Sequence, residues 1–279
     1  MFRKISLFLL LILAMTTVGA CAPAPSIVNR LPAATSTPAP DPWEEAVSDA
    51  QLALAGADLD AHFQFYQETA TQIDGYLAQL ETVQPALNFI DALKQTELPV
   101  LGNVWDLLVR ALDKAYLGAG VGLEQVDARL RDLLETHERL QRLDELGQTS
   151  TAVSQFQEAP SRETLQAMGE EMAEADFILA GVDKDAVGLQ DKVDALLAAI
   201  EKAQSGLALV GGLAPQLQDA VKKIQQFIDD IVTPLRELSR TLDTLRKQIA
   251  EDRDIFWHIR DIIHQAENPP GAFLWPARA

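Results

Sequence analysis

A regular spacing of apolar residues across about a hundred positions is the feature that most limits how this chain can fold. Between Leu165 and Ile263 an apolar side chain recurs at every third or fourth position, interrupted once at Asp252 and broken once near Gly211. Such a stripe is typical of long helices that pack lengthwise, with side chains of one helix entering gaps of the other. The stripe comprises Leu165, Met168, Met172, Ala175, Leu179, Val182, Ala186, Leu189, Val193, Leu196, Ile200, Ala203, Leu207 and Val210, then Leu217, Val221, Ile224, Ile228, Ile231, Leu235, Leu238, Leu242, Leu245, Ile249, Phe256, Ile259 and Ile263.

The break in this stripe predicts a tight reversal between two antiparallel helices. Gly211 and Gly212 allow positive φ, and Pro215 suits the first turn of a new helix. At ~1.5 Å per residue, helices of about 45 to 50 residues are roughly 70 Å long. Pro234 leaves the apolar phase undisturbed, so we expect a kink there rather than an end.

The rest of residues 42–267 also has a helical composition, which predicts one all-α domain. Looser heptads at 42–83 and 122–158 predict two further long helices, and shorter ones are expected near 85–96 and 103–117. Asp41 and Asn103 are the expected N-caps, and breaks are expected at 97–99, 118–122 and 159–160. The predicted fold is an elongated antiparallel helical bundle with coiled-coil-like long helices. Residues 268–279 are expected to form a non-helical C-terminal tail.

The first 21 residues have the layout of an export signal. Arg3 and Lys4 precede an apolar run from Ile5 to Met15, which is shorter than the roughly 20 residues that a membrane-spanning helix needs. The final four, Val18, Gly19, Ala20 and Cys21, resemble the lipobox of bacterial lipoproteins. That resemblance implies a signal peptide over 1–20, cleavage before Cys21, and a diacylglycerol on the sulfur of Cys21. The alternative is ordinary cleavage after Ala20, which would leave a free thiol.

Residues 21–41 predict a tether between this anchor and the helical domain. The segment is rich in proline, alanine, serine and threonine, so it cannot bury enough apolar surface to fold by itself. Fully extended, its twenty or so residues span up to ~60 Å. Cys21 is the only cysteine, so the helical domain has no disulfide and no cysteine nucleophile.

Charge argues against two classes of partner. The formal net charge is −18, whereas binding to nucleic acid or adhesion to anionic lipid requires clustered Lys and Arg. We therefore expect no nucleic acid among the partners, and we interpret the charges as a solvated helical surface. The alternative is an acidic surface that meets a basic partner or divalent cations.

No pattern in the chain predicts catalysis. The histidines are His62, His137, His258 and His264, and Asp261 with His264 superficially matches half of a di-iron motif. The apolar phase turns Asp254, His258 and Asp261 outward, so no metal site is expected. We also find no glycine-rich phosphate loop and no nucleophile–base arrangement. The expectation is a protein without enzymatic activity and without cofactors.

Two apolar segments are candidate partner contacts. Residues 205–214 form an uncharged tip between the long helices, which is loosely similar to the hydrophobic head of helical pore-forming toxins of the hemolysin type. Ten residues cannot span a ~30 Å membrane core as a helix, so a buried turn or a partner contact is favoured. Residues 272–276 could fold back onto the bundle or present an aromatic peptide. The candidates are Leu207, Leu209, Val210, Leu213, Phe273, Leu274 and Trp275.

These observations predict a membrane-anchored bacterial lipoprotein whose extracytoplasmic helical bundle acts as a scaffold, spacer or protein-interaction module. It would be exported and held by Cys21 on the outer face of the cell membrane or on the outer membrane, with an envelope protein or a second copy as its partner. A domain that senses a small molecule or binds a substrate is the alternative, because a bundle can hold a pocket without a local motif. A helical pore-forming protein is a third class.

Overall fold

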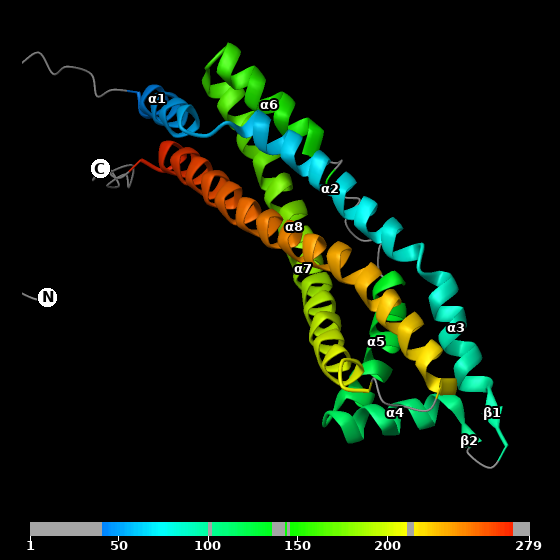
Figure 1. Cartoon of the computed structure of the whole chain (residues 1–279). Coiled ribbons are helices and arrows are strands. Elements are labelled where there is room, and N and C mark those ends of the chain that lie inside the picture. Colours follow the sequence, from blue (N-terminus) through cyan, green and yellow to red (C-terminus); the bar gives the residue numbers. More distant parts are fainter. Residues whose placement is uncertain (1–40, 100–101, 136–142, 144–145, 211–214, 270–279) are drawn as a thin grey trace, which may run out of the picture. The chain divides into compact units, whose positions relative to one another are not determined.

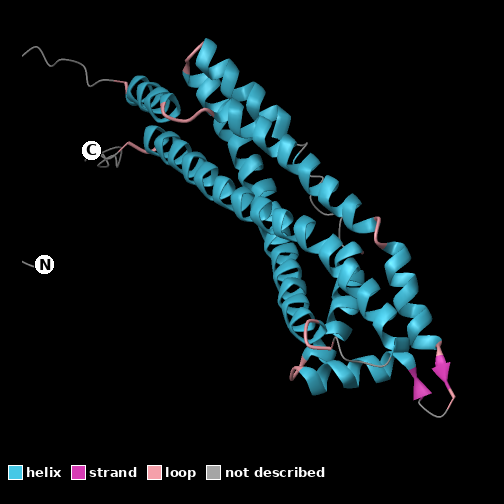
Figure 2. Cartoon of the chain, in the orientation of Figure 1, coloured by secondary structure: helices cyan, strands magenta, loops and turns pink. Residues whose placement is uncertain are grey.

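The computed structural model describes residues 41–99, 102–135, 143, 146–210 and 215–269. Nearly all of these residues are helical, and they belong to one compact unit over Pro40–Ala279 (Figures 1 and 2). The fold is therefore the all-α bundle that the sequence predicts. Its elements are α1 (Pro42–Ala55), α2 (Leu59–Glu81), α3 (Gln84–Gln95), β1 (Glu97–Leu98), β2 (Gly102–Asn103), α4 (Val104–Ala115), α5 (Ala119–Leu134), α6 (Gly147–Glu158), α7 (Arg162–Leu207) and α8 (Pro215–Glu267).

Helices α7 and α8, of 46 and 53 residues, pack against each other in antiparallel fashion. Three polar contacts trace the pairing: Asp176 with Arg253, Asp183 with Arg246, and Gln190 with Ser239. Successive contacts are seven residues apart on each helix, which is the heptad spacing of a coiled coil. The two predicted long helices, their heptad and their lengthwise packing are confirmed. We call this series of contacts the polar ladder.

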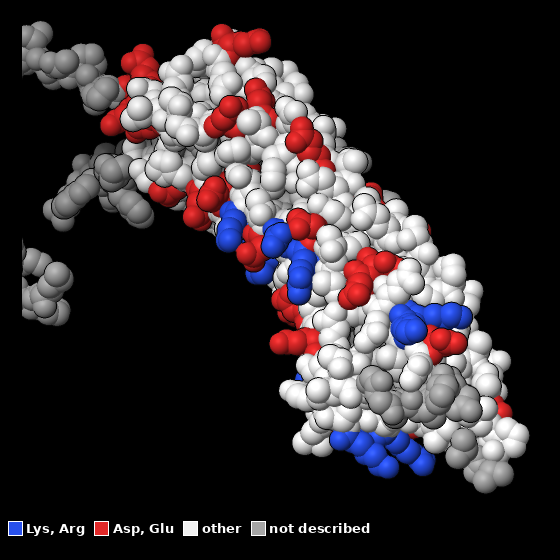
Figure 3. Space-filling view, in the orientation of Figure 1, with Lys and Arg blue, Asp and Glu red and all other residues white. Residues whose placement is uncertain are grey.

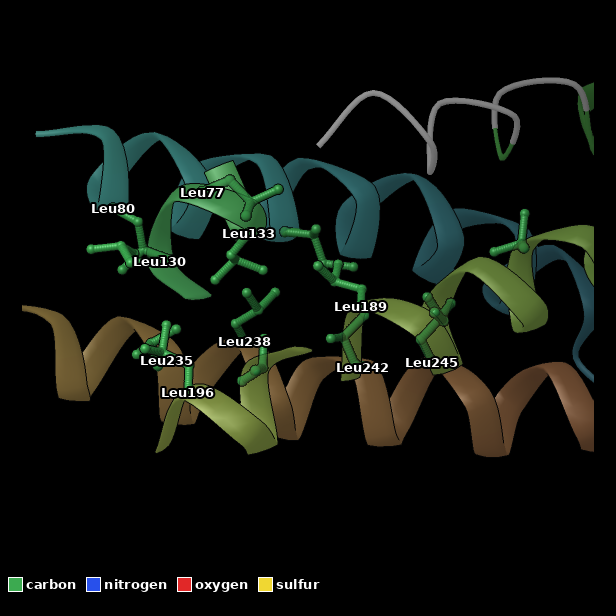
Figure 4. Packing of buried hydrophobic residues seen from close by; sticks show 14 of the residues in the cluster. Leu77, Leu80, Leu130, Leu133, Leu189, Leu196, Leu235, Leu238, Leu242 and Leu245 are labelled. Atoms are coloured by element: carbon green, nitrogen blue, oxygen red, sulfur yellow. The ribbon is translucent and has the colours of Figure 1, made fainter. Parts of the chain in front are cut away.

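The apolar stripe of the sequence forms the centre of the core. Each of its members is buried except Ile263, which is half-buried. Figure 4 shows where leucines of α2, α5, α7 and α8 meet, including Leu77, Leu130, Leu189 and Leu242. Burying a leucine contributes about 1.5–3 kcal/mol, so this shared seam stabilises the packing of all four helices.

The shorter helices cover the α7–α8 pair and define its two ends. Helices α1, α2 and α3 pack on α8, and α5 and α6 pack on α7, while α4 packs on α5 (Figure 1). At one end, Arg162 at the start of α7 lies 4.4 Å from the ring centre of Trp43 in α1. At the other, Lys223 near the start of α8 lies 4.7 Å from the ring centre of Phe89 in α3. We call the first the tether end, because α1 follows the predicted tether, and the second the distal end.

The helix starts follow the predicted caps. Asp41 accepts a hydrogen bond from the amide of Trp43, and Asn103 accepts bonds from the amides of Trp105 and Asp106. Each carboxylate or amide oxygen thus satisfies an amide that the first helical turn leaves unpaired. Pro234 lies inside α8, which continues through it as predicted.

The two other long helices that the sequence predicts are each divided in the structure. Residues 42–83 form α1 and α2, because Gly56 ends α1 and Asp58 caps α2 through the amide of Ala61. The 122–158 segment contains most of α5 and then α6, with residues 136–142 and 144–145 outside the described part. The expected break at 118–122 is confined to Gly118, where φ is +86°, since α5 begins at Ala119. A two-stranded antiparallel pair, β1–β2, joins α3 to α4 and was not predicted.

Two glycines of α5 that looked like helix breakers instead allow close packing. A Cβ on Gly120 would lie 2.3 Å from the carbonyl oxygen of Val109 in α4. A Cβ on Gly122 would lie 2.9 Å from the Cβ of Lys202 in α7. The absence of a side chain lets α5 approach both neighbours, and this offsets the low helix propensity of glycine.

Among the described helices, none contains a stretch both long and apolar enough to cross a membrane.

Candidate functional site

An exposed apolar corner lies at the distal end. Within the described residues seven large apolar side chains are exposed, and four of them come from the α4–α5 turn, the first turn of α5 and the residues that follow α7. Leu117 is 92% exposed and Leu209 is 61% exposed. Isolated exposed leucines are common on protein surfaces, but a group of them indicates a contact with another molecule. We call Tyr116, Leu117, Val121 and Leu209 the distal corner.

The local structure explains why Tyr116 and Leu117 point outward and why the end of α7 lies beside them. Gly118 takes the left-handed conformation that turns the chain between α4 and α5, so Tyr116 and Leu117 project from the turn. Asp113 accepts a hydrogen bond of 2.8 Å from the amide of Gly120 and holds the turn on α4. A Cβ on Gly206 would lie 2.3 Å from the Cβ of Ala119, so the end of α7 touches the start of α5.

The distal corner has cationic neighbours, whereas much of the chain is acidic. Arg110 and Lys114 lie on the exposed side of α4, and Lys202 is exposed near the end of α7. A group of Lys and Arg is visible at the distal end in Figure 3. By contrast, residues 31–93, which include α1, α2 and most of α3, contain no Lys or Arg. The cations of this acidic chain are therefore unevenly distributed along its sequence.

The structure divides the candidate partner residues that the sequence suggested. Leu207, the last residue of α7, and Val210 are buried, at 2% and 5% exposure, whereas the predicted reversal at Gly211 and Gly212 lies outside the described residues. Leu209 alone among the described candidates is exposed. Sequence reasoning missed Tyr116, Leu117 and Val121, and the only signal for them was their position beside Gly118. The other site residues that the sequence predicts lie outside the described part of the chain: Val18, Gly19, Ala20, Cys21, Leu213, Phe273, Leu274 and Trp275.

A groove with a volume of about 560 Å³ lies between α7 and α8 at the tether end. Gly169, Ala173, Trp257 and Ile263 give it an apolar lining. Carboxylates and two basic groups stand around this lining: Glu170, Asp261, Glu267, Arg260 and His264. We call it the tether-end groove.

The groove begins where the polar ladder ends. One heptad beyond Asp176 and Arg253, the ladder would pair residue 169 with residue 260, but residue 169 is a glycine. Within the described residues Arg260 forms no ion pair, and its guanidinium lies 4.9 Å from the ring centre of Trp257. Arg260 therefore has no carboxylate opposite it on α7, whereas Arg253 pairs with Asp176 and Arg246 pairs with Asp183.

A buried polar cluster crosses from α2 to α8 farther along the bundle. Asp252, which is fully buried, interrupts the apolar stripe. It accepts hydrogen bonds from the Tyr66 hydroxyl at 2.5 Å and from Gln248 Nε2 at 3.0 Å, and its Oδ1 lies 2.7 Å from His62 Nδ1. Burial and the adjacent Asp252 carboxylate raise the pKa of the Tyr66 hydroxyl well above its usual range. These hydrogen bonds satisfy the buried carboxylate of Asp252 and join α2 to α8.

The histidine-rich stretch of α8 has the orientation that the sequence predicts. Asp254, His258 and Asp261 are exposed, and His264 is exposed at the rim of the tether-end groove. No group of three or more His, Cys, Asp or Glu within the described residues is arranged to hold a metal ion. His137 lies outside the described residues.

No family model and no curated protein matches this chain.

Proposed function

We propose that this protein is a membrane-anchored bacterial lipoprotein whose extracytoplasmic helical bundle is a scaffold that presents its distal corner to an envelope protein. In this proposal Cys21 carries the lipid, residues 21–41 are the tether, and the bundle begins at α1. The support for the anchor is the N-terminal pattern of Arg3, Lys4, the apolar run and Val18-Gly19-Ala20-Cys21.

The direction of the bundle supports a scaffold. The tether would enter at α1, which packs beside the start of α7 and on α8. The distal corner lies at the far end of α7, and a helix of 46 residues is about 69 Å long at ~1.5 Å per residue. A tethered bundle of this kind would hold its distal corner well away from the membrane to which it is attached.

The single observation that carries the partner contact is the gathering of four exposed apolar side chains at one place. Leaving a leucine such as Leu117 in water forfeits the burial free energy of about 1.5–3 kcal/mol. A partner that covers Tyr116, Leu117 and Leu209 together would recover much of it, and aromatic residues such as Tyr116 are enriched at interfaces. Arg110 and Lys114 beside them favour a partner surface that carries carboxylates.

The experiment is site-specific photocrosslinking in cells with the full-length protein. A photoreactive amino acid replaces Leu117 in one variant and Leu52, which is 77% exposed on α1 at the tether end, in the control. The expected result is a stoichiometric crosslink from position 117 to one envelope protein and none from position 52. Equal labelling from both positions, or products that contain only this chain, would contradict a distal docking site.

A further inference from the structure

The tether-end groove lies where Ile263 of α8 packs onto Gly169 of α7. Gly169 is buried, and a Cβ placed on it would lie 2.3 Å from Cδ1 of Ile263. Ile263 thus lies over Gly169, in the region where another rung of the polar ladder would stand. The result is an apolar floor of Ile263 and Ala173, one heptad beyond the polar rung of Asp176 and Arg253.

The same groove has an aromatic side chain with little to cover it. Trp257 is 55% exposed, and its one described ring contact is with Arg260, 4.9 Å away. A tryptophan buries up to about 250 Å² of surface when it is covered, so an exposed one beside an apolar floor indicates an interaction surface.

The chain itself continues from the edge of this groove. Glu267 lines the groove and is the last residue of α8, and the described part of the chain ends two residues later, at Pro269. Going back from Glu267 to Trp257 covers ten residues of helix, about 15 Å, whereas residues 268–275 reach up to ~26 Å when extended. Pro269, Pro270 and Gly271 are residues that favour a turn. The following residues are therefore long enough, and begin in the right place, to return along the groove.

The chemistry of these residues matches the groove. Phe273, Leu274 and Trp275 are apolar, and the segment 270–279 has one cation, Arg278, and no Asp or Glu. The groove offers an apolar floor, and its rim has three carboxylates against one arginine. Apolar side chains and a cation on the segment thus meet an apolar lining and a surplus of negative charge on the groove.

We propose that the tether-end groove binds the protein's own C-terminal segment 272–278. Phe273 and Trp275 pack on Ile263 and Trp257, and Arg278 lies by the carboxylates of the rim. Because the segment is joined to α8 by only a few residues, its effective concentration at the groove is in the millimolar range. A modest intrinsic affinity is then enough to keep the groove occupied. This inference does not depend on the lipid anchor or on a distal partner.

The test places a photoreactive amino acid at position 273 of the full-length protein and identifies the crosslinked peptides by mass spectrometry. The expected products join position 273 to residues 166–173 or 257–264. An equal mixture of ¹⁴N- and ¹⁵N-labelled protein separates the possible sources, because a segment that binds its own chain gives products with a single isotope. Products of mixed isotope would mean that a second copy supplies the segment, and they would overturn the proposal.

A matched pair of variants makes the test specific to the groove. Ala173→Glu adds a charged side chain to the floor of the groove and is expected to abolish the crosslink, whereas Ala198→Glu, on the exposed side of the same helix, is expected to leave it intact. Circular dichroism of both variants establishes that each is folded. Crosslinks that form elsewhere on the chain, that survive Ala173→Glu, or that reach only another protein would overturn the proposal.

Discussion

The hydroxyl of Tyr66 donates a 2.5 Å hydrogen bond to Asp252, across 186 positions of sequence and inside the core. Both residues are fully buried, and His62 and Gln248 complete the surroundings of the same carboxylate. A buried polar group that loses its partner costs about 1–3 kcal/mol. The contact between α2 and α8 therefore depends on this cluster as well as on leucine packing.

Tyr66→Phe is expected to lower the free energy of unfolding by about 1–3 kcal/mol, because it leaves Asp252 with one hydrogen-bond donor fewer. Urea denaturation followed by circular dichroism measures the change. Tyr76→Phe is the control, since Tyr76 lies on the same helix, is half-buried, and makes no described hydrogen bond through its hydroxyl. An equal loss in both variants would show that the Tyr66–Asp252 bond contributes little.

Alkaline pH should also reveal this bond. The pKa of Tyr66 is raised in the folded protein by burial and by Asp252, so the folded chain keeps a proton that an unfolded tyrosine loses above about pH 10. The contribution is complete below pH 10, and above it the free energy of unfolding falls by up to about 1.4 kcal/mol per pH unit. Denaturation curves from pH 8 to 11.5 measure this slope. Lysines titrate in the same range, so the decisive quantity is the difference from Tyr66→Phe, which should lack this part of the slope.

Two glycine substitutions should change stability in opposite directions. Gly120→Ala is expected to destabilise the bundle by about 1–3 kcal/mol, because the new methyl group would meet the backbone oxygen of Val109. Gly188→Ala is expected to stabilise it by about 0.5–1 kcal/mol, because Gly188 is exposed within α7 and its surroundings are open. Thermal and urea unfolding compare the two variants with the parent. A gain in stability from Gly120→Ala would contradict the close α4–α5 contact.

The polar ladder should contribute measurable coupling. In a double-mutant cycle we expect about 1 kcal/mol between Asp176 and Arg253, which are 2.7 Å apart and mostly shielded from water. The exposed pair Lys247 and Asp243, within one helix at 3.1 Å, should give about 0.3 kcal/mol. Repeating both cycles in 1 M salt should weaken the exposed pair more strongly. Equal coupling in the two cycles would mean that the ladder adds nothing beyond ordinary surface pairs.

The anchor is tested by Cys21→Ser. We expect this variant either to leave the membrane fraction or to keep its signal peptide, since serine cannot carry the thioether-linked lipid. Cell fractionation and intact-mass measurement distinguish the two results. A Cys21→Ser protein that is processed and still bound to the membrane would refute lipid attachment at this residue.

Helix caps and the spacing of apolar residues predict most of the helical architecture. Asp41 and Asn103 begin helices because their side chains cap them, and the stripe from Leu165 to Ile263 forms the α7–α8 seam because its period matches a heptad. Gly56 was passed over because a single glycine inside a helical pattern is usually tolerated. Gly120 and Gly122 show the opposite error, because they were expected to break a helix and instead allow α5 to pack closely on α4 and α7.

The sites were less accessible to sequence reasoning because they depend on distant residues. Asp252 stood out as an interruption of the stripe, but no local rule identifies Tyr66 and His62, which come from another helix, as its partners. Likewise, Leu117 and Leu209 belong to one corner only because Ala119 touches Gly206. Helical phase did succeed for Asp254, His258 and Asp261, since an outward position needs no knowledge of neighbours.

The polar ladder also raises the question of what keeps α8 from sliding along α7. Because its rungs repeat every seven residues, a displacement of one heptad would still match several of them, and the leucines would again face leucines. The residues that do not repeat must therefore set the alignment. Shifted by seven positions, Ile263 would leave Gly169 and face Asp176 or Arg162, and Asp252 would lose Tyr66. One glycine and one aspartate, both exceptions to the heptad, thus give the long helices a single alignment.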